Sequence, residues 1–490
     1  MSSRRPGFLV MQYPTTPMTS IQSIVRLLLD VARVMKGGNF DRADEDDRSR
    51  ERNARLALAA ATGVVVRGSS FVVNIVSVGL LYRHFDELTF GIWLTLTSLW
   101  MILMLVSDLG VGGGIMNETA RATAAADEGR LAAIYSSGQA ILVIIGVVFA
   151  SVLWIVALSV PWEVALKIPA GAATRDFSIG LGLMGTGIAF MVCTGLFTLV
   201  KSGQQKAHEA NLWSAGALFG GLAAVAAGVA LDASFATIAA GFYITPALVL
   251  LFALARFVLR LSPNSRPKLS AVDRELVQTL LRTGMALLLL KLLTGLTTFS
   301  DGLLISAVLG PERVQDVAVP ARLFNIVTLA ITMFITPLWP IYAHAMASGD
   351  SEWVRRTFFR SIRLACVVGF PMVFIFVLVH PWILQVWLGG SFEASRYIVA
   401  GLAVTCMLEA FGTACAMLLN AGQMFRAQLI MGAFYLAASL SLRVLALNLF
   451  GTQGVPAAAA VAYVATVGIP LFFVVRKFLR DGAGRLAVKT

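Results

Sequence analysis

The sequence predicts an all-α polytopic membrane protein, with twelve transmembrane helices in two six-helix lobes related as an internal repeat. Of its 490 residues, 58% are hydrophobic and only 13% are charged, whereas soluble domains carry roughly 25% charged residues. Spanning helices need about 20 mostly apolar residues. Windows of this kind begin near residues 56, 90, 131, 178, 210, 235, 283, 318, 361, 396, 427 and 455.

The basic residues are segregated along the chain. Most of the 39 Lys and Arg residues lie in the N-terminal tail, in the loop after every second span, and at the C-terminus. Only Arg83, Lys167, Arg175, Arg313 and Arg396 fall on the other side. Because basic loops are retained in the cytoplasm, we expect a multi-pass protein of a bacterial inner membrane with both termini cytoplasmic. The net charge of +12 reflects this topology, and we expect no nucleic-acid partner.

These patterns divide the chain into five parts. Residues 1–55 form a cytoplasmic tail, in which the amphipathic run 21–35 either lies on the anionic membrane surface or belongs to a poorly ordered segment. Residues 56–260 form the N-lobe, and the Pro- and Ser-containing stretch 261–282 is a cytoplasmic linker. Residues 283–477 form the C-lobe, and residues 478–490 form a second cytoplasmic tail.

A polar stripe recurs on the first helix of each lobe. Arg67, Ser70, Asn74 and Ser77 have the same spacing as Lys291, Thr294, Thr298 and Asp301. At 100° per residue, each set lies within an arc of about 80°. The two cations lie roughly 16 and 12 Å from the cytoplasmic ends of their helices. Two lobes that each present such a stripe predict a transport site near the midplane, where the cations would bind an anion from the cytoplasm.

Further charges lie within the predicted spans. Asp108, in the cytoplasmic third, could neutralise Arg67 or Lys291, in which case the cation would join helices and bind no substrate. Asp301 could pair with Arg322, although Arg322 and Arg443 lie near the outer ends of their spans, where we expect them to snorkel to the interface. Glu409 is either a group that couples transport to H⁺ or Na⁺, or a protonated carboxyl bonded to a neighbouring helix.

The sequence does not predict an enzyme. It lacks the G-x-x-x-x-G-K-[ST] phosphate loop and the H-E-x-x-H zinc motif, and we expect no metal and no cofactor. The longest outer connection, about residues 160–177, contains only the carboxylates Glu163 and Asp176. A membrane glycan polymerase or ligase would need a larger outer loop, so these activities are the weaker alternatives.

Several short motifs are familiar. They are Phe90-Gly91-Ile92-Trp93, Ser107-Asp108-Leu109-Gly110, Leu309-Gly310, Val319-Pro320-Ala321-Arg322-Leu323, Pro337-Leu338-Trp339-Pro340 and Leu419-Asn420-Ala421-Gly422. With them the sequence resembles the O-antigen and exopolysaccharide flippase family, whose superfamily also includes multidrug-and-toxin extrusion (MATE) transporters and lipid II flippases. The resemblance implies a V of two six-helix bundles around a cationic cavity, which Arg67 and Lys291 would line. The longer N-terminal tail departs from the family pattern, and twelve spans disfavour lipid II as substrate, because lipid II flippases have fourteen.

The resulting prediction is a flippase that moves a polyprenyl-diphosphate-linked oligosaccharide across the inner membrane, for lipopolysaccharide O-antigen or exopolysaccharide synthesis. The diphosphate would bind Arg67 and Lys291, and the sugars would bind the hydroxyl and amide side chains of the stripes. Membrane lipid, a polysaccharide polymerase and glycosyltransferases are the expected partners. The alternative from the same superfamily is a cation-coupled exporter of drugs or metabolites, which should favour acidic residues in its cavity.

Overall fold

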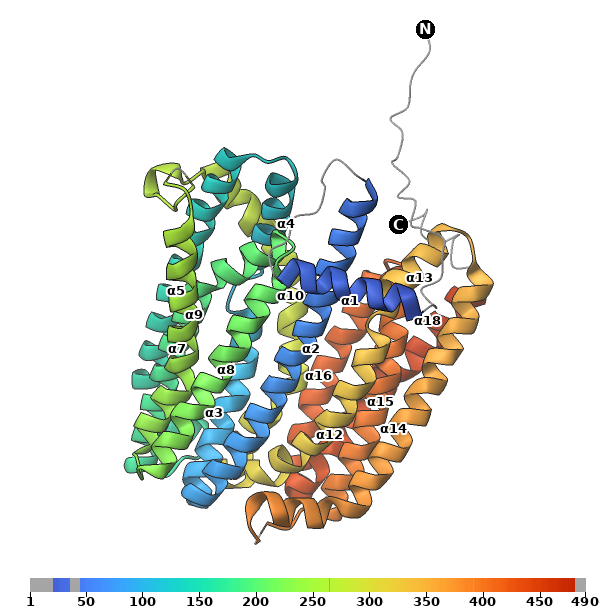
Figure 1. Cartoon of the computed structure of the whole chain (residues 1–490). Coiled ribbons are helices and arrows are strands. Elements are labelled where there is room, and N and C mark those ends of the chain that lie inside the picture. The colour runs from blue at the N-terminus through green and yellow to red at the C-terminus, as the bar shows by residue number, and fades with distance from the viewer. Residues whose placement is uncertain (1–20, 36–44, 264, 391, 481–490) are drawn as a thin grey trace.

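The computed structural model describes residues 21–35, 45–263, 265–390 and 392–480, and all regular structure in these ranges is helical. The first half of the chain begins with a short helix and continues through eight more (Figure 1). These helices are α1 (Ile21–Met35), α2 (Glu45–His84), α3 (Glu87–Val106), α4 (Val111–Ala124), α5 (Glu128–Ser159), α6 (Trp162–Ala165), α7 (Ala172–Gly203), α8 (Ala207–Ala230) and α9 (Phe235–Arg260).

The second half repeats this pattern of long helices with short breaks. Its elements are η1 (Leu269–Ala271), α10 (Arg274–Phe299), α11 (Asp301–Leu309), η2 (Pro311–Arg313), α12 (Val314–Ile335), α13 (Leu338–Ala347), α14 (Ser351–Leu388), α15 (Arg396–Ala421), α16 (Phe425–Phe450), η3 (Gly451–Gly454), α17 (Val455–Tyr463), η4 (Val464–Gly468) and α18 (Ile469–Arg480).

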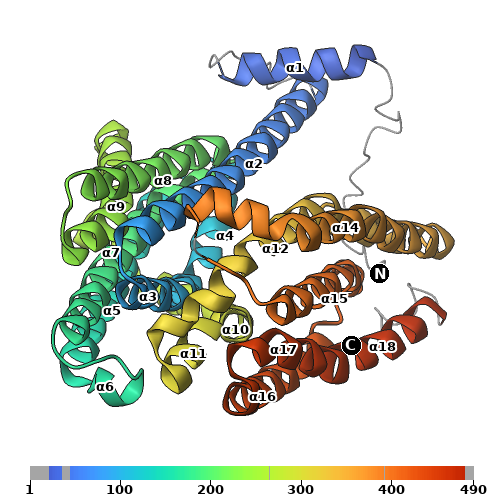
Figure 2. The same ribbon diagram turned by 90° about the horizontal axis from the view of Figure 1, so that it is seen from below.

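Ten stretches of the described residues are long and apolar enough to cross a membrane, and the bent pair of α10 and α11 makes an eleventh. The last stretch, Phe425–Arg480, has 56 residues, or about 84 Å of helix against roughly 30 Å of hydrocarbon. Its chain turns at Gly451, whose φ is +63°, and α17 packs on α16 (Figure 2). The prediction of an all-helical membrane protein is confirmed, while the count of twelve spans stays a prediction.

Aspartate caps fix where several helices begin. Asp86, Asp127 and Asp350 each accept a hydrogen bond from the backbone N–H three residues later, at 3.3, 2.8 and 3.0 Å. Such a cap satisfies one of the amides that the first turn of a helix leaves without a partner. The caps place the beginnings of α3, α5 and α14 at polar turns, so the apolar runs that follow them are free to enter the membrane.

The helices pack in two groups with α10 between them. In the first group, α7 packs on α3, α4, α5 and α9, and α8 packs on both α2 and α9. In the second group, α15 packs on α12, α14 and α17, and α16 packs on α17. Helix α10 contacts α3 and α4 of the first group and α16 of the second, as the view from below shows (Figure 2). Since α10 follows the linker in sequence, it connects the two groups; their assignment as the lobes 56–260 and 283–477 stays a prediction.

The second span ends earlier than its apolar window suggests. The sequence extends this span to about Met116, but α3 ends at Val106 and a turn precedes α4. Gly110 in this turn has φ +77°, and a Cβ there would lie 2.1 Å from the carbonyl oxygen of Gly284 on α10. The break therefore lets the two backbones approach more closely than any side chain would permit.

We expect Gly110→Ala to lower the free energy of unfolding by about 2 kcal/mol or more, because it combines a left-handed backbone with a steric clash. Thermal unfolding of the purified protein in detergent measures the effect. Gly216→Ala in α8 is the matched control, since nothing lies within 4 Å of its Cβ position. The control should gain up to about 1 kcal/mol from helix propensity. Equal melting temperatures for the two variants would contradict the close contact.

Candidate functional site

The first polar stripe begins at an exposed cation. Arg67 and Ser70 are exposed on α2, near the middle of a span that runs from Asn53 to His84. Among the described residues, Arg67 has no ion-pair partner. A charge at this depth is costly in lipid but tolerated where it faces water or a ligand. Arg67 thus has the properties of an anion-binding residue, and its role as one stays a prediction.

Farther along α2 the stripe becomes buried between helices. The amide oxygen of Asn74 accepts a hydrogen bond of 2.8 Å from Nε of Arg322 on α12. Nη1 of Arg322 also donates to the carbonyl oxygen of Ala318 at 2.6 Å. Ser77 is 3% exposed, and its hydroxyl has no hydrogen-bond partner among the described residues. The snorkelling prediction for Arg322 is wrong, because α2 provides a hydrogen-bond acceptor inside the bundle.

Lys291, the first cation of the second stripe, is paired with an acid. Its Nζ lies 2.9 Å from Oδ1 of Asp108, and the two side chains are 35% and 27% exposed. Asp108 also accepts a hydrogen bond of 3.0 Å from the backbone N–H of Gly110 and so stabilises the turn before α4. Of the two arrangements considered for Asp108, the structure therefore has the one in which Asp108 neutralises Lys291. Since both groups are partly exposed, the pair is open to competition by an incoming anion.

The remaining residues of the second stripe differ in exposure and in the partners that they contact. Thr298 is exposed, whereas the side chain of Thr294 lies outside the described residues. Asp301 follows a 49° bend between α10 and α11, and its carboxylate lies 3.1 Å from Nη1 of Arg443 on α16. This distance fits an ion pair, although the angle is not that of a hydrogen bond. The prediction that Asp301 pairs with Arg322 is therefore wrong.

Arg443, on α16, stabilises the bend between α10 and α11. Only 4% exposed, it donates from Nη1 to the carbonyl oxygen of Thr297 at 3.1 Å and to the hydroxyl of Ser300 at 3.3 Å. A bend frees backbone carbonyls, and an interior cation can satisfy them. The snorkelling prediction for Arg443 is therefore wrong. Glu409 on α15 lies within electrostatic range of Arg443 and Asp301, and its part in H⁺ or Na⁺ coupling stays a prediction.

We expect Arg443→Met to lower the free energy of unfolding by about 2 kcal/mol, because it leaves the partly exposed carboxylate of Asp301 without its partner. The double variant Asp301→Asn with Arg443→Met should recover more than half of this loss. Thermal unfolding of the three proteins in one detergent gives the coupling between the two residues. Additive losses in the double variant would show that the two side chains do not stabilise each other.

A set of contacts that the sequence did not predict joins α2 to the end of α14. Nε1 of Trp387 donates to the carbonyl oxygen of Ile75 at 2.8 Å. Arg83 donates to the carbonyl oxygens of Trp387 and Leu388 at 2.9 and 3.2 Å, and these are among the last carbonyls of α14, which helix geometry leaves free. Gly79 makes room for the Trp387 ring, since a Cβ there would lie 2.9 Å from its Nε1. In the sequence, the signals that could have indicated this contact are Gly79 and the run Trp387-Leu388-Gly389 at the end of a span.

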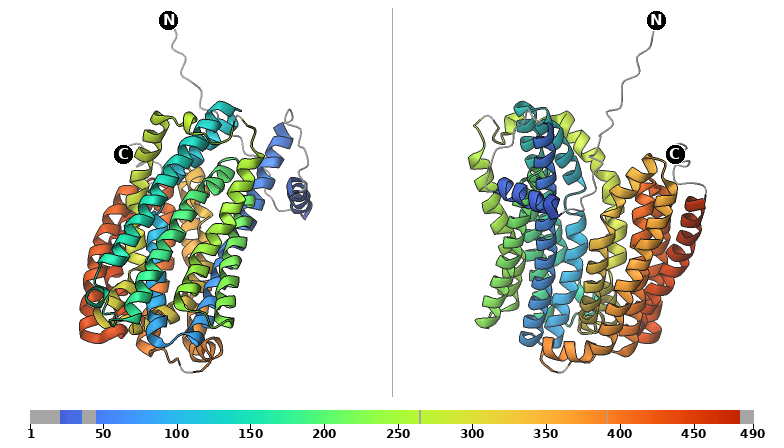
Figure 3. Two further views of the ribbon diagram at one scale, coloured as in Figure 1. Left: turned by 90° about the vertical axis from the view of Figure 1, so that its left-hand side faces the viewer. Right: turned by 45° about the vertical axis from the view of Figure 1, so that its right-hand side comes forward.

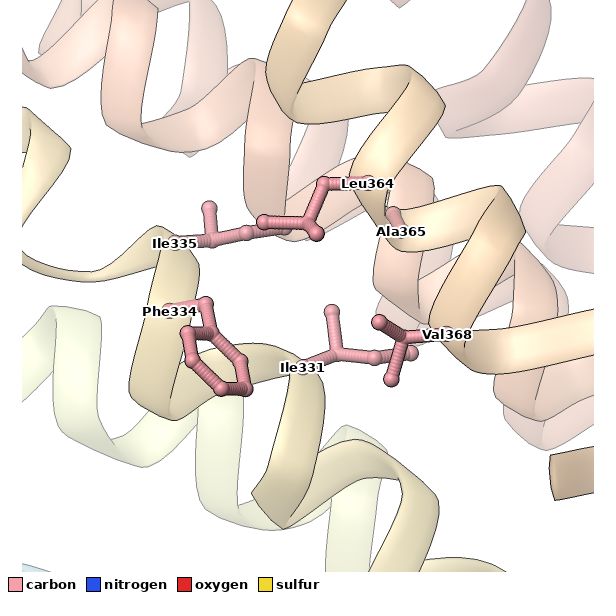
Figure 4. A pocket seen from close by; sticks show the side chains of 6 residues that line it. All are labelled: Ile331, Phe334, Ile335, Leu364, Ala365 and Val368. Carbon is pink, nitrogen blue, oxygen red and sulfur yellow. The ribbon is translucent and has the colours of Figure 1, made fainter.

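The small hollow between α12 and α14 has a different chemistry (Figure 4). It is too narrow to hold a water molecule and is lined by Ile331, Phe334, Ile335, Leu364, Ala365 and Val368. Figure 4 shows these apolar side chains facing one another across the space. No polar side chain lines it, so it does not provide an anion site, and Arg67 lies on a different helix.

Solved structures share this arrangement of helices. The inward-facing conformation of a multidrug resistance MATE family transporter of the MOP superfamily matches with a TM-score of 0.69 and 15% identity, over 84% of this chain and 96% of that chain. The outward-facing conformation of such a transporter matches with a TM-score of 0.58 and 16% identity, over 87% and 96%. A MOP superfamily transporter from Pyrococcus furiosus, described as having a binding pocket of reverse polarity, gives 0.57 and 16%, also over 87% and 96%.

Many apolar helices, with charged side chains between them, define the class: the protein is a multi-pass membrane protein with the helix arrangement of the MATE transporters. It belongs to the family described as "Polysaccharide biosynthesis protein", whose sequence profile matches residues 89–396. The resemblance to the polysaccharide flippase family is thereby confirmed. No curated protein sequence matches the chain significantly.

Proposed function

We propose that the protein is a flippase, which moves a polyprenyl-diphosphate-linked oligosaccharide across a bacterial inner membrane for surface polysaccharide synthesis. The observation that carries the proposal is Arg67, an exposed cation inside a membrane span with no ion-pair partner among the described residues. A cation favours an anionic substrate, whereas exporters of cationic drugs need acidic sites. The polysaccharide biosynthesis family supports the same choice.

In this proposal the two stripes bind different parts of the headgroup. The Arg67 guanidinium binds the diphosphate with two parallel hydrogen bonds. Lys291 moves from Asp108 to the second phosphate, which is feasible because the pair is partly exposed. Ser70 and Thr298, both exposed, offer hydroxyl groups to the sugars. In this proposal Asn74 and Ser77 reach the sugars only when the contact between α2 and α12 opens, and Thr294 stays a candidate from its place in the stripe. The polyprenyl chain stays in the lipid between the lobes, because its transfer into water would be strongly unfavourable.

We propose that the conformation described here is open toward the cytoplasm. The contacts of Trp387 and Arg83 join α2 to α14 at the end of the bundle opposite α1 (Figure 1). Helix α2 begins and α18 ends at the other end, where the positive-inside rule places the cytoplasm. The higher TM-score with an inward-facing transporter, 0.69 against 0.58, supports this assignment. Transport then requires the contacts between α2 and α14 to break while the opposite end closes.

Deleting the gene in its host tests the proposal directly. We expect the lipid-linked oligosaccharide to accumulate on the cytoplasmic face, where enzymes added to inside-out vesicles can modify it and enzymes added to intact spheroplasts cannot. Surface polysaccharide should be lost at the same time. Accumulation on the outer face would instead indicate a polymerase or ligase. The absence of any accumulation would indicate an exporter of drugs or metabolites.

A further inference from the structure

Helix α1 is attached to α2 through one of its faces. Asp30 is 5% exposed, and its carboxylate accepts hydrogen bonds from Arg50 on α2, 3.1 Å from Nε and 2.8 Å from Nη2. Leu27, Val31 and Val34 are half-buried on the same side of α1. A bidentate pair of this kind fixes orientation as well as distance. The attachment therefore determines which other face of α1 points away from the bundle.

The face that points away from the bundle is apolar. Val25, Leu28, Leu29 and Met35 are 48, 62, 66 and 68% exposed. Their spacing of i, i+3, i+4 and i+10 puts them on one stripe of the helix. Arg26 and Arg33, both exposed, lie about 100–120° around the helix from the centre of this stripe, at 100° per residue. Helices with this division of residues bind membrane surfaces.

The position of α1 relative to the membrane is set by α2. Arg50 lies three residues before Asn53, where the apolar span begins, a distance of about 5 Å along the helix. Helix α1 runs across α2: it lies across the bundle in Figure 1 and is seen end-on beside α2 in the left view of Figure 3. It thus runs parallel to the membrane plane at the level of the lipid headgroups.

We infer that α1 is a docking site for anionic phospholipid of the inner leaflet. The apolar stripe enters the boundary between headgroups and acyl chains, and Arg26 and Arg33 bind headgroup phosphates beside it. Two features favour lipid over a protein partner: the level of the helix at the start of the span, and arginines at the border of the stripe, where side chains snorkel to phosphates. This surface is separate from the transport site and does not depend on the transported substrate.

Photo-crosslinking identifies what covers the stripe. The full-length protein carries the photoreactive residue p-benzoylphenylalanine at Leu28 and is reconstituted in vesicles of phosphatidylethanolamine and phosphatidylglycerol. Ala125, exposed in the turn between α4 and α5, is the matched control position. We expect about tenfold more phospholipid adduct at position 28 than at position 125. A crosslink to a second copy, a crosslink within the chain, or lipid adduct no higher than at position 125 would overturn the inference.

The arginines are tested in the same assay. Arg26→Gln with Arg33→Gln leaves the apolar stripe unchanged, and it should lower the phosphatidylglycerol share of the adducts severalfold without loss of total lipid adduct. An unchanged share would overturn the recognition of anionic headgroups. Since no glycan is measured, the result is independent of whether the proposed flippase function holds.

Discussion

Arg67→Ala is expected to abolish surface polysaccharide while the protein remains in the membrane at its normal level. A hydrogen bond to a charged group contributes about 1.5–3 kcal/mol, and more in a site of low dielectric constant. Loss of both bonds of a bidentate contact should therefore reduce transport at least about a hundredfold. Arg67→Lys should keep part of the activity, because it retains the positive charge but cannot form the two parallel hydrogen bonds of a guanidinium. Glycan output and the amount of protein in isolated membranes are the measurements.

Two controls separate substrate binding from folding. Arg355→Ala removes an exposed cation on α14 outside the proposed site and should leave glycan output unchanged. For Lys291, the comparison is between Lys291→Met alone and together with Asp108→Asn. If the pair only joins helices, the double variant recovers activity; if Lys291 binds the diphosphate, it stays inactive, and we expect the latter. Full output from Arg67→Ala combined with Lys291→Ala would disprove the anion site.

The second large effect concerns the contacts between α2 and α14. We expect a disulfide between Gly79→Cys and Trp387→Cys to stop transport completely and a reducing agent to restore it. A Cβ at Gly79 would lie 3.3 Å from the backbone carbonyl oxygen of Trp387. The two backbones are therefore close, and we expect cysteines at these positions to form the disulfide. The crosslink fixes one end of the bundle closed, and alternating access requires that end to open.

The disulfide between positions 79 and 387 has to be tested in a protein that contains no other thiols. The native cysteines at positions 193, 366, 406 and 415 are free and are replaced first. Trp387→Cys alone, exposed to the same oxidant, is the control and should keep its activity. Transport assayed before and after reduction, alongside the gel mobility of the crosslinked form, gives the result. Undiminished transport by the fully crosslinked protein would contradict the proposal that this contact must break.

Local chemistry in the sequence was sufficient for the all-helical membrane fold, although not for the number of spans. Apolar windows identified the membrane helices because burial in hydrocarbon depends on composition and length. Four glycines follow Asp108 within six residues. Such a cluster permits a close approach of backbones, and Gly110 makes one with Gly284 on α10. The end of α3 was placed too late, since a window of apolar residues carries no information about where the backbone turns.

The partners of the interior charges could not be predicted from the sequence. Arg443 was assigned to the interface from its position along a span, but the bend after Thr297 supplies a carbonyl and an acid that hold it inside. The pairing of Arg322 with Asp301 was wrong, because Arg322 donates instead to the amide oxygen of Asn74 from the other half of the chain. A helical pattern gives the face on which a residue lies but not which distant helix lies opposite.

The sequence by itself determined that the chain is a membrane-spanning helical protein with a basic side, and that two helices carry matching polar stripes led by cations. These properties follow from composition and from the helical repeat, which act over neighbouring residues. Only the tertiary structure decided that Arg67 has no ion-pair partner among the described residues, whereas Lys291 forms an ion pair with Asp108. That difference depends on distances between helices far apart in the chain, and it makes Arg67 the stronger candidate for binding the substrate.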